Sequence, residues 1–207
     1  MPEAGGTPAL PVGRGRRSQL GGAVLAGGQS RRMGRDKALL RVGGEVLWER
    51  QVRVLRVAGA QPVVVVRRGE QSALGRDKRQ RIRNLVDTFV DAGPLAGLHA
   101  ALAAAETPLV AVLAVDMPEI DAAWFRWLAG FCREESGAVV RHADGFEPLA
   151  AIYPRSVLVT VTRRLRRDAL SMQELIKGLV RAKRMTVVSL PEEERWRVKN
   201  WNRPKDR

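Results

Sequence analysis

The segment Leu25 to Lys37 (LAGGQSRRMGRDK) has the composition of a phosphate-binding loop. Two adjacent glycines, Gly27 and Gly28, leave the backbone uncovered, so that consecutive N–H groups can approach the oxygens of an anion. Basic side chains in the same segment add mobile positive charge. These are Arg31, Arg32 and Lys37. The combination predicts a site for a nucleoside triphosphate.

Two better-known phosphate loops do not fit this chain. It contains neither G-x-G-x-x-G, which is typical of dinucleotide-binding enzymes, nor the P-loop pattern G-x-x-x-x-G-K-[ST]. Both classes are therefore excluded.

Two aspartates follow predicted strands. Asp116 comes directly after the apolar run 109–115, and Asp87 comes after the weaker run 82–86. Open α/β sheets bind ligands at the carboxyl ends of their strands. A carboxylate at that edge, together with phosphate oxygens and water, suits Mg²⁺. Asp116 is therefore the predicted metal ligand, whereas Asp87 by residue type alone is an ordinary turn residue.

Short apolar runs alternate with longer amphipathic stretches from Gly21 onward, which predicts strands joined by helical crossovers. Strands are predicted at residues 22–26, 61–67, 82–86, 109–115, 138–142, 147–153 and 185–190. Helices are predicted at residues 45–58, 94–105, 121–135, 155–167 and 171–178. We therefore expect one three-layer α/β domain over residues 21–207, with a mostly parallel sheet and helices on both faces.

Residues 1–20 lack this periodicity and are rich in Gly, Pro and Arg, which predicts a disordered basic tail. No apolar run approaches the roughly 20 residues of a membrane span, and the tail has no export-signal pattern. Cys132 is the only cysteine of the chain, which excludes a disulfide framework. These features predict a cytoplasmic protein that does not bind a membrane.

The chain is strongly basic, with 36 Lys and Arg against 22 Asp and Glu and a net charge of +14. The basic residues are scattered, and we find no zinc-finger spacing, RNA-binding strand pattern or basic region followed by heptads. The charge therefore favours a solvated Arg-rich surface, and nucleic acid is not an expected partner.

The segment 25–37 resembles the L-A-G-G-x-S-x-R-M-G-x-D-K motif of the molybdenum cofactor guanylyltransferases and related nucleotidyltransferases. The resemblance continues through Val86-Asp87, Gly93-Pro94-Leu95-Ala96-Gly97 and Val115-Asp116-Met117-Pro118. It ends at Asn200-Trp201-Asn202-Arg203-Pro204-Lys205-Asp206, which is similar to the family's closing N-x-N-x-P-x-D. It implies a Rossmann-like nucleotidyltransferase fold.

The resemblance also implies roles for single residues. Lys37 would bind the phosphates, Asp87 the guanosine portion of GTP, and Asp116 both the nucleotide and Mg²⁺. Asn200 and Asn202 would lie near the pterin acceptor. The backbone contacts to the nucleotide would come from Leu25, Ala26, Gly27 and Gly28.

The implied reaction transfers GMP from GTP to the terminal phosphate of molybdenum-bound molybdopterin, with release of pyrophosphate. Lys37 and Asp116 would be the catalytic residues. The implied protein partners are molybdenum-cofactor insertion proteins or apo-molybdoenzymes, contacted transiently.

Several alternatives stay open on the residues alone. Val66 stands where bacterial relatives often have Asn, so a cytidylyltransferase acting on the same pterin is an alternative. A nucleotidyltransferase acting on another phosphorylated acceptor is a second alternative. A non-catalytic protein that binds nucleotide or pterin is a third, from a different class.

Overall fold

The computed structural model describes residues 19–27, 37–69, 82–89, 91–133 and 135–201. Within these ranges the strands are β1 (Leu20–Leu25), β2 (Arg41–Val42), β3 (Glu45–Val46), β4 (Val63–Arg67), β5 (Arg83–Val86), β6 (Leu109–Ala114), β7 (Gly137–His142), β8 (Gly145–Phe146), β9 (Ala150–Pro154) and β10 (Met185–Ser189). The α-helices are α1 (Leu47–Val57), α2 (Pro94–Ala104), α3 (Ala122–Ala129), α4 (Leu158–Arg166) and α5 (Met172–Arg181). Short 3-10 helices are η1 (Lys37–Leu39), η2 (Arg155–Val157) and η3 (Glu192–Val198).

Among the described residues, eight strands form one mixed sheet in the order β10-β7-β9-β6-β1-β4-β5, with β8 paired to β7. The pairs β1–β4, β1–β6, β4–β5 and β7–β10 are parallel, whereas β9 runs antiparallel to β6 and β7. The central strands are buried along almost their whole length, which explains their continuous apolar runs. The mostly parallel α/β fold predicted from the sequence is therefore confirmed.

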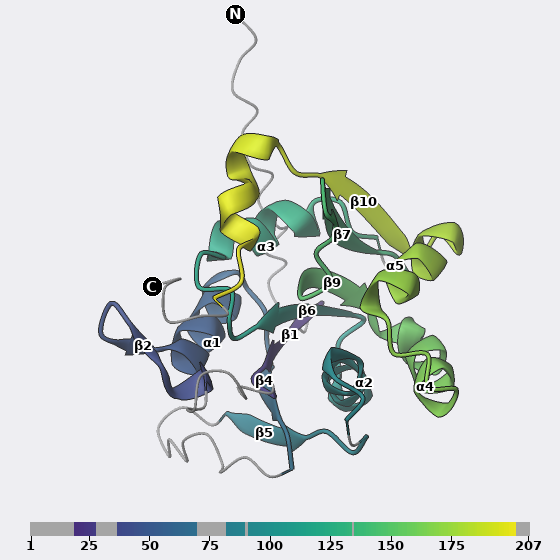
Figure 1. Cartoon of the computed structure of the whole chain (residues 1–207), viewed down its shortest axis with the longest axis horizontal. Coiled ribbons are helices and arrows are strands. Elements are labelled where there is room, and N and C mark those ends of the chain that lie inside the picture. Colours follow the sequence, from purple (N-terminus) through teal and green to yellow (C-terminus); the bar gives the residue numbers. More distant parts are fainter. Residues whose placement is uncertain (1–18, 28–36, 70–81, 90, 134, 202–207) are drawn as a thin grey trace, which may run out of the picture.

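Helices cover both faces of the sheet (Figure 1). One apolar cluster joins α1 and α3 to alternate strand residues such as Val24, Val65 and Leu113. A second cluster joins α2, α4 and α5 to the intervening residues, such as Ala23, Val64 and Val112. This alternation follows from the two-residue period of a strand, which sends neighbouring side chains to opposite faces.

Several predicted boundaries differ from the observed ones. The helix predicted to Glu135 ends at Ala129, because the N–H of Gly130 turns back to the carbonyl of Trp127. Cys132 therefore lies after the end of the helix and not within it. The strand predicted from Glu147 begins at Ala150, since the backbone N–H of Leu149 bonds to the Glu147 side chain in a turn.

Other differences are confined to the ends of elements. Strand β1 starts at Leu20, which is buried and which the sequence analysis assigned to the tail. The predicted helix 45–58 starts at Leu47, because Glu45–Val46 pair with β2 in a small hairpin. Helix 155–167 begins as η2, and α5 continues to Arg181. The hairpin, β8, η1 and η3 have no counterpart in the prediction.

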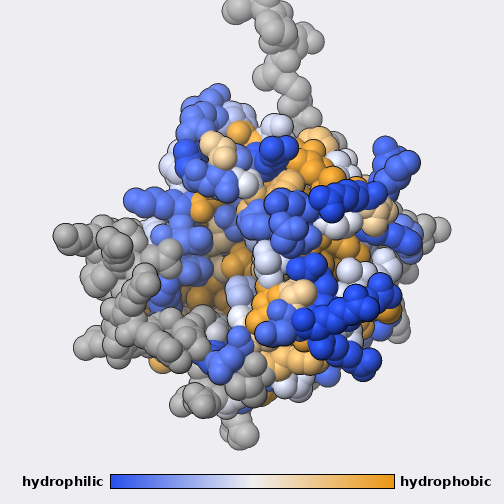
Figure 2. Space-filling model, turned by 45° about the vertical axis from the view of Figure 1, so that its right-hand side comes forward, coloured by the Kyte–Doolittle hydropathy of each residue, from blue (hydrophilic) through white to orange (hydrophobic). Residues whose placement is uncertain are grey.

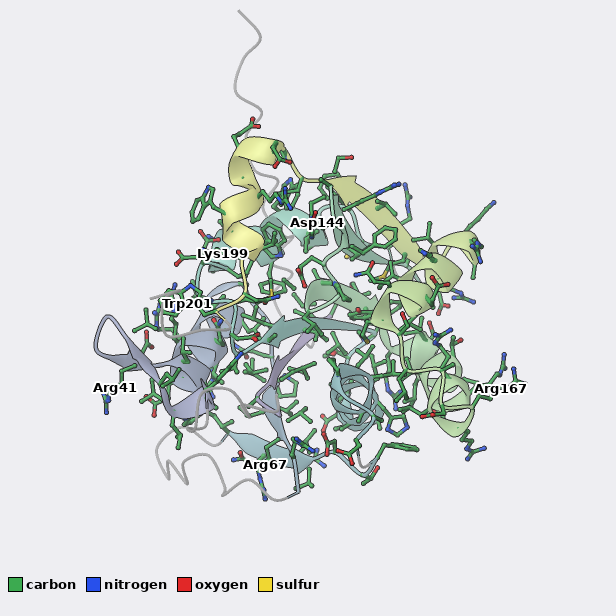
Figure 3. The ribbon with its side chains drawn as sticks, viewed as in Figure 1. Arg41, Arg67, Asp144, Arg167, Lys199 and Trp201 are labelled. Carbon is green, nitrogen blue, oxygen red and sulfur yellow. The ribbon has the colours of Figure 1, made fainter. Side chains whose placement is uncertain are left out.

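The side of the molecule that carries α4 and α5 is largely hydrophilic, with small apolar patches between the charged side chains (Figure 2). Arg163, Arg166 and Arg167 of this region are exposed, and Arg167 points away from the body of the protein (Figure 3). This agrees with the prediction that much of the positive charge is solvated. No helix in the described part of the chain is long and apolar enough to cross a membrane.

Gly137, at the start of β7, offers a test of the sheet's packing. A Cβ atom at this position would lie 1.9 Å from the carbonyl oxygen of Ile152 on β9. We expect Gly137→Ala to lower the free energy of unfolding by about 3 kcal/mol, because backbone atoms of two buried strands would have to separate. Urea unfolding monitored by Trp fluorescence measures the change.

Gly178→Ala is the matched control. A Cβ on this glycine of α5 would meet nothing within 4 Å. The change should raise the free energy of unfolding by about 0.5–1 kcal/mol, because alanine loses less backbone entropy in a helix. Equal unfolding midpoints for the two variants would contradict the close approach of β7 and β9.

Candidate active site

A cavity of about 510 Å³ lies at the edge of the sheet where β1, β4, β5 and β6 end. The beginning of α2 closes one side of it. Its lining residues are Leu25, Ala26, Gly27, Lys37, Val66, Arg68, Asp87, Phe89, Asp91, Gly93, Pro94, Gly97, Ala114, Val115, Asp116 and Leu149. Six residues that the sequence analysis selected for nucleotide or metal binding are therefore brought to one cavity: Leu25, Ala26, Gly27, Lys37, Asp87 and Asp116.

The floor of the cavity is the end of β1 and the residues after it. The N–H of Ala26 donates to the carbonyl of Val66 (2.8 Å), and the N–H of Val115 donates to the carbonyl of Leu25 (3.1 Å). These bonds hold the start of the glycine loop between β4 and β6. A Cβ on Gly27 would lie 3.0 Å from Arg68 Cγ and 3.6 Å from Asp87 Oδ2. A side chain at position 27 would therefore crowd these two residues, and glycine avoids this contact.

Lys37 and Asp116, which both line the cavity, form an ion pair. Lys37 Nζ lies 3.3 Å from Asp116 Oδ2, although the two residues are 79 positions apart in the chain. Their side chains are only 14% and 23% exposed, so water screens the pair less than it would at an open surface. The cation therefore lies beside the carboxylate at the end of the central strand.

Asp87 lies at the opposite wall, next to Arg68. Burial raises the pKa of the Asp87 carboxyl above its ordinary value, and the positive charge of Arg68 acts in the other direction. Arg68 Nη2 also donates to Asp91 Oδ1 at 3.2 Å. The Asp87 carboxylate and the Arg68 guanidinium, which follow β5 and β4, thus provide hydrogen-bonding groups at this wall of the cavity.

Glu147 is a further buried carboxylate near Asp116. It is 7% exposed, and its Oε1 accepts a hydrogen bond from the N–H of Leu149 (3.2 Å). The β6–β9 ladder ends with the pair Leu113–Ala150, and beyond it the N–H of Ala114 donates to the carbonyl of Leu149. The antiparallel pairing of β9 therefore brings the segment that contains Glu147 beside the loop that contains Asp116.

Burial raises the pKa of Glu147 from 4.5 to about 7, and the negative charge of Asp116 adds to this shift. The hydrogen bond from Leu149 acts in the opposite direction.

The C-terminal segment reaches the same edge of the sheet. The backbone N–H of Trp201 donates to the carbonyl of Asp116 at 2.9 Å, and Figure 3 shows Trp201 beside this part of the fold. The Oδ1 atom of the adjacent Asn200 is buried and has no hydrogen-bond partner among the described residues. Asn200 therefore stands next to the residue that contacts Asp116, and its expected place near a pterin acceptor stays a prediction.

Four of the predicted site residues lie outside the described residues: Gly28, Arg31, Arg32 and Asn202.

The described lining carries three carboxylates and two cations: Asp87, Asp91 and Asp116 against Lys37 and Arg68. Among the described lining residues, carboxylates therefore outnumber cations. The described residues contain no group of three or more His, Cys, Asp or Glu that could hold a metal on its own. A single carboxylate completed by phosphate oxygens and water suits Mg²⁺, which prefers such sites. Asp116 fits that description.

Residues 22–185 match the family model of the MobA-like NTP transferase domain. A probable molybdenum cofactor guanylyltransferase from Opitutus terrae is 64% identical over 193 residues, which cover 92% of this chain and 94% of the relative. Among solved structures, molybdopterin-guanine dinucleotide biosynthesis protein A from Archaeoglobus fulgidus superimposes with a TM-score of 0.68 at 26% identity, covering 89% of this chain and 93% of that one.

A 2-C-methyl-D-erythritol 4-phosphate cytidylyltransferase from Thermus thermophilus superimposes with a TM-score of 0.64 at 17% identity, covering 89% of this chain and 93% of that one. At this identity the likeness concerns the fold alone. The arrangement of sheet and helices is therefore one that is also found in a nucleotidyltransferase with another substrate.

The raised pKa of Glu147 predicts a pH-dependent stability. A carboxyl whose pKa is higher in the folded than in the unfolded state stabilises the fold most below about pH 4.5, and this contribution is lost as the pH rises through about 7. Glu147→Gln keeps the acceptor for Leu149 but cannot ionise. Between pH 5 and pH 8 the variant should gain about 2–3 kcal/mol of unfolding free energy relative to the unchanged protein.

Urea unfolding at both pH values measures this difference. Glu106→Gln makes the same chemical change at an exposed position and serves as the control. A constant stability difference between Glu147→Gln and the unchanged protein at the two pH values would contradict the raised pKa.

Proposed function

The chain belongs to the family of MobA-like NTP transferases, and on this premise we propose that it transfers GMP from GTP to the terminal phosphate of molybdenum-bound molybdopterin. The products are the guanine dinucleotide form of the cofactor and pyrophosphate. The observation that carries this proposal is the Lys37–Asp116 ion pair at the end of the central strand, inside a cavity large enough for a nucleotide. The name of the Opitutus terrae relative supports the choice of substrates.

The nucleotide binds across the carboxyl ends of β1, β4 and β5 in this proposal. The backbone of residues 25–28 contacts it, and Gly27 leaves room for that approach. Asp87 contacts the guanosine portion through a carboxylate that accepts hydrogen bonds from O–H or N–H groups. Its position at the cavity wall supports this role.

The phosphates lie toward Lys37. Its ammonium group neutralises negative charge that gathers on the pyrophosphate as it leaves, and Arg31 and Arg32 add further positive charge in the same segment. Mg²⁺ would be held by Asp116 together with phosphate oxygens, and when bound it supplies Lewis-acid stabilisation of that charge. The excess of carboxylates over cations in the described lining supports the need for a metal.

The reaction is a displacement at the α-phosphorus of GTP. An oxygen of the pterin's terminal phosphate forms a bond to the α-phosphorus. The bond from the α-phosphorus to the oxygen that bridges to the β-phosphate breaks, and its electron pair leaves with pyrophosphate. No proton must be removed from the attacking oxygen, so the protein contributes mainly alignment and charge neutralisation.

The acceptor approaches from the side of the C-terminal segment. Asn200 lies next to Trp201, whose N–H is bonded to the Asp116 carbonyl. The unpartnered Oδ1 of Asn200 is a hydrogen-bond acceptor suited to the N–H groups of a pterin. Asn202 belongs to the same motif and completes the proposed acceptor side.

A cytidylyltransferase acting on the same pterin is the second candidate. Val66 lines the cavity as a buried apolar residue, so no amide is available there to read the base. Asp87, Asp91 and Arg68 are the described charged side chains at that wall, and a carboxylate beside a guanidinium suits the donors and acceptors of guanine and of cytosine alike. The name of the Opitutus terrae relative is what favours GTP over CTP.

Pyrophosphate release by the purified protein decides between these candidates. With Mg²⁺ and molybdenum-bound molybdopterin, we expect release with GTP and none with CTP, ATP or UTP. Release with CTP alone would keep the mechanism and change the product. No release with any nucleotide would favour a non-catalytic binding protein.

Variants of the ion pair test the two catalytic residues. Lys37→Ala and Asp116→Ala should each lower kcat/KM on the order of 10²-fold or more, because each removes a charge that acts on the transferred or leaving phosphate. Lys177→Ala is the matched control, since this exposed lysine of α5 pairs only with nearby Glu174 among the contacts described for it. An unchanged kcat/KM for Lys37→Ala would rule out its catalytic role.

A further inference from the structure

A side chain of α1 forms hydrogen bonds to the backbone of the loop that contains Asp116. Gln51 Nε2 donates a hydrogen bond to the carbonyl of Met117 at 2.8 Å and a longer one to the carbonyl of Ala114 at 3.4 Å. One amide therefore bridges the residues on either side of Asp116. The Gln51 side chain is fully buried, so water does not compete for these bonds.

Arg50, the residue before Gln51 in α1, also forms hydrogen bonds to this loop. Arg50 donates to the carbonyl of Pro118 through both Nε (3.1 Å) and Nη2 (2.5 Å). Two adjacent side chains of one helix thus bind three carbonyls of residues 114–118. The peptide of Asp116 itself is held from elsewhere, because its carbonyl accepts from Trp201.

A purely structural role explains Gln51 poorly. Helix α1 otherwise packs on the sheet through apolar residues such as Val52 and Leu55, and Gln51 is surrounded by that cluster. Burying an amide costs free energy unless all of its polar atoms are paired, and Gln51 Oε1 has no partner among the described residues. An apolar side chain of similar size would fill the space at lower cost. The two N–H bonds to the loop are what the glutamine contributes.

The same helix also fixes the other half of the ion pair. The N–H of Leu47, the first residue of α1, donates to the carbonyl of Leu40 at 2.8 Å, directly after the 3-10 helix η1 that contains Lys37. Lys37 and Asp116 come from distant parts of the chain, but both are tied to the first half of α1. The distance between their charged groups therefore depends on the hydrogen bonds that this half of the helix makes to the two segments.

We propose that Gln51, assisted by Arg50, is a positioning residue that sets the Asp116 carboxylate relative to Lys37 for nucleotidyl transfer. The expected effect on kcat rests on the proposed function, whereas the expected effect on the Asp116 loop rests only on the hydrogen bonds of Gln51. Neither residue lines the cavity, so both act through the loop and not on the substrate.

Gln51→Met tests the proposal, because methionine keeps the length of the side chain and removes both N–H donors. We expect kcat to fall about 10- to 100-fold, since a small displacement of a catalytic group has effects of this size. The KM for GTP should change less than about 2-fold, because the base and ribose side of the cavity is untouched. Arg50→Lys should lower kcat less than Arg50→Met, since lysine retains a donor for Pro118.

Val54→Ala is the matched control for lost stability. Val54 is a buried residue of α1 that makes no hydrogen bond to the loop. The variant should lower the unfolding midpoint without changing kcat. If Gln51→Met and Val54→Ala both leave the kcat of the folded protein unchanged, Gln51 serves packing only and the proposal is wrong.

Hydrogen exchange of the Trp201 backbone amide gives a readout that does not require turnover. This N–H donates to the carbonyl of Asp116, so a shifted loop should make it exchange about 10-fold faster in Gln51→Met, while Val54→Ala leaves the rate within about 2-fold of the unchanged protein. Equal exchange rates in the two variants would overturn the proposal. If the unchanged protein releases no pyrophosphate, the proposed function fails, and the exchange rates still decide whether Gln51 positions Asp116.

Discussion

The contact on which the site depends is the ion pair between Lys37 and Asp116. It joins the segment after the glycine loop to the end of the central strand, and these segments meet only because β1 and β6 are parallel neighbours whose carboxyl ends reach the same edge. The pair is partly shielded from water, so its charges interact more strongly than those of a surface pair would. Helix α1 contacts both segments, which is the basis of the positioning role proposed for Gln51.

Charge within the cavity follows from this arrangement. Among the described lining residues, the fold brings together Asp87 and Asp91, which follow β5, and Asp116, which follows β6, and it supplies fewer cations. Two of these carboxylates form ion pairs, Asp91 with Arg68 and Asp116 with Lys37. Burial raises the pKa of the third, Asp87, because it disfavours the charged form. Mg²⁺ bound together with a triphosphate would offset this excess of carboxylates in the described lining, which supports the magnesium nucleotide of the proposed function.

The antiparallel strand β9 begins at the same edge of the sheet as the candidate site. Strand β7 brings the chain to this edge and β9 leads it away against β6, so the segment before β9, with Glu147, lies near Asp116. Burial of the Glu147 carboxyl near the charge of Asp116 disfavours its ionised form, and this raises the pKa of Glu147. The C-terminal segment closes the same side through Trp201.

The sequence was sufficient to predict the strands with continuous apolar runs and their alternation with helices, because burial on both faces restricts the residue types of such strands. Lys37 and Asp116 were also selected from the sequence, and the structure brings them to one cavity, whereas their catalytic roles stay a prediction. The end of α3 at Ala129, the start of β9 at Ala150 and the contacts of Gln51 and Glu147 could not be read from the sequence. They depend on the tertiary structure. Gln51 and Glu147 are chemically ordinary in their local sequence, and they become significant through contacts with a loop more than 30 residues away in the chain, which no local periodicity encodes.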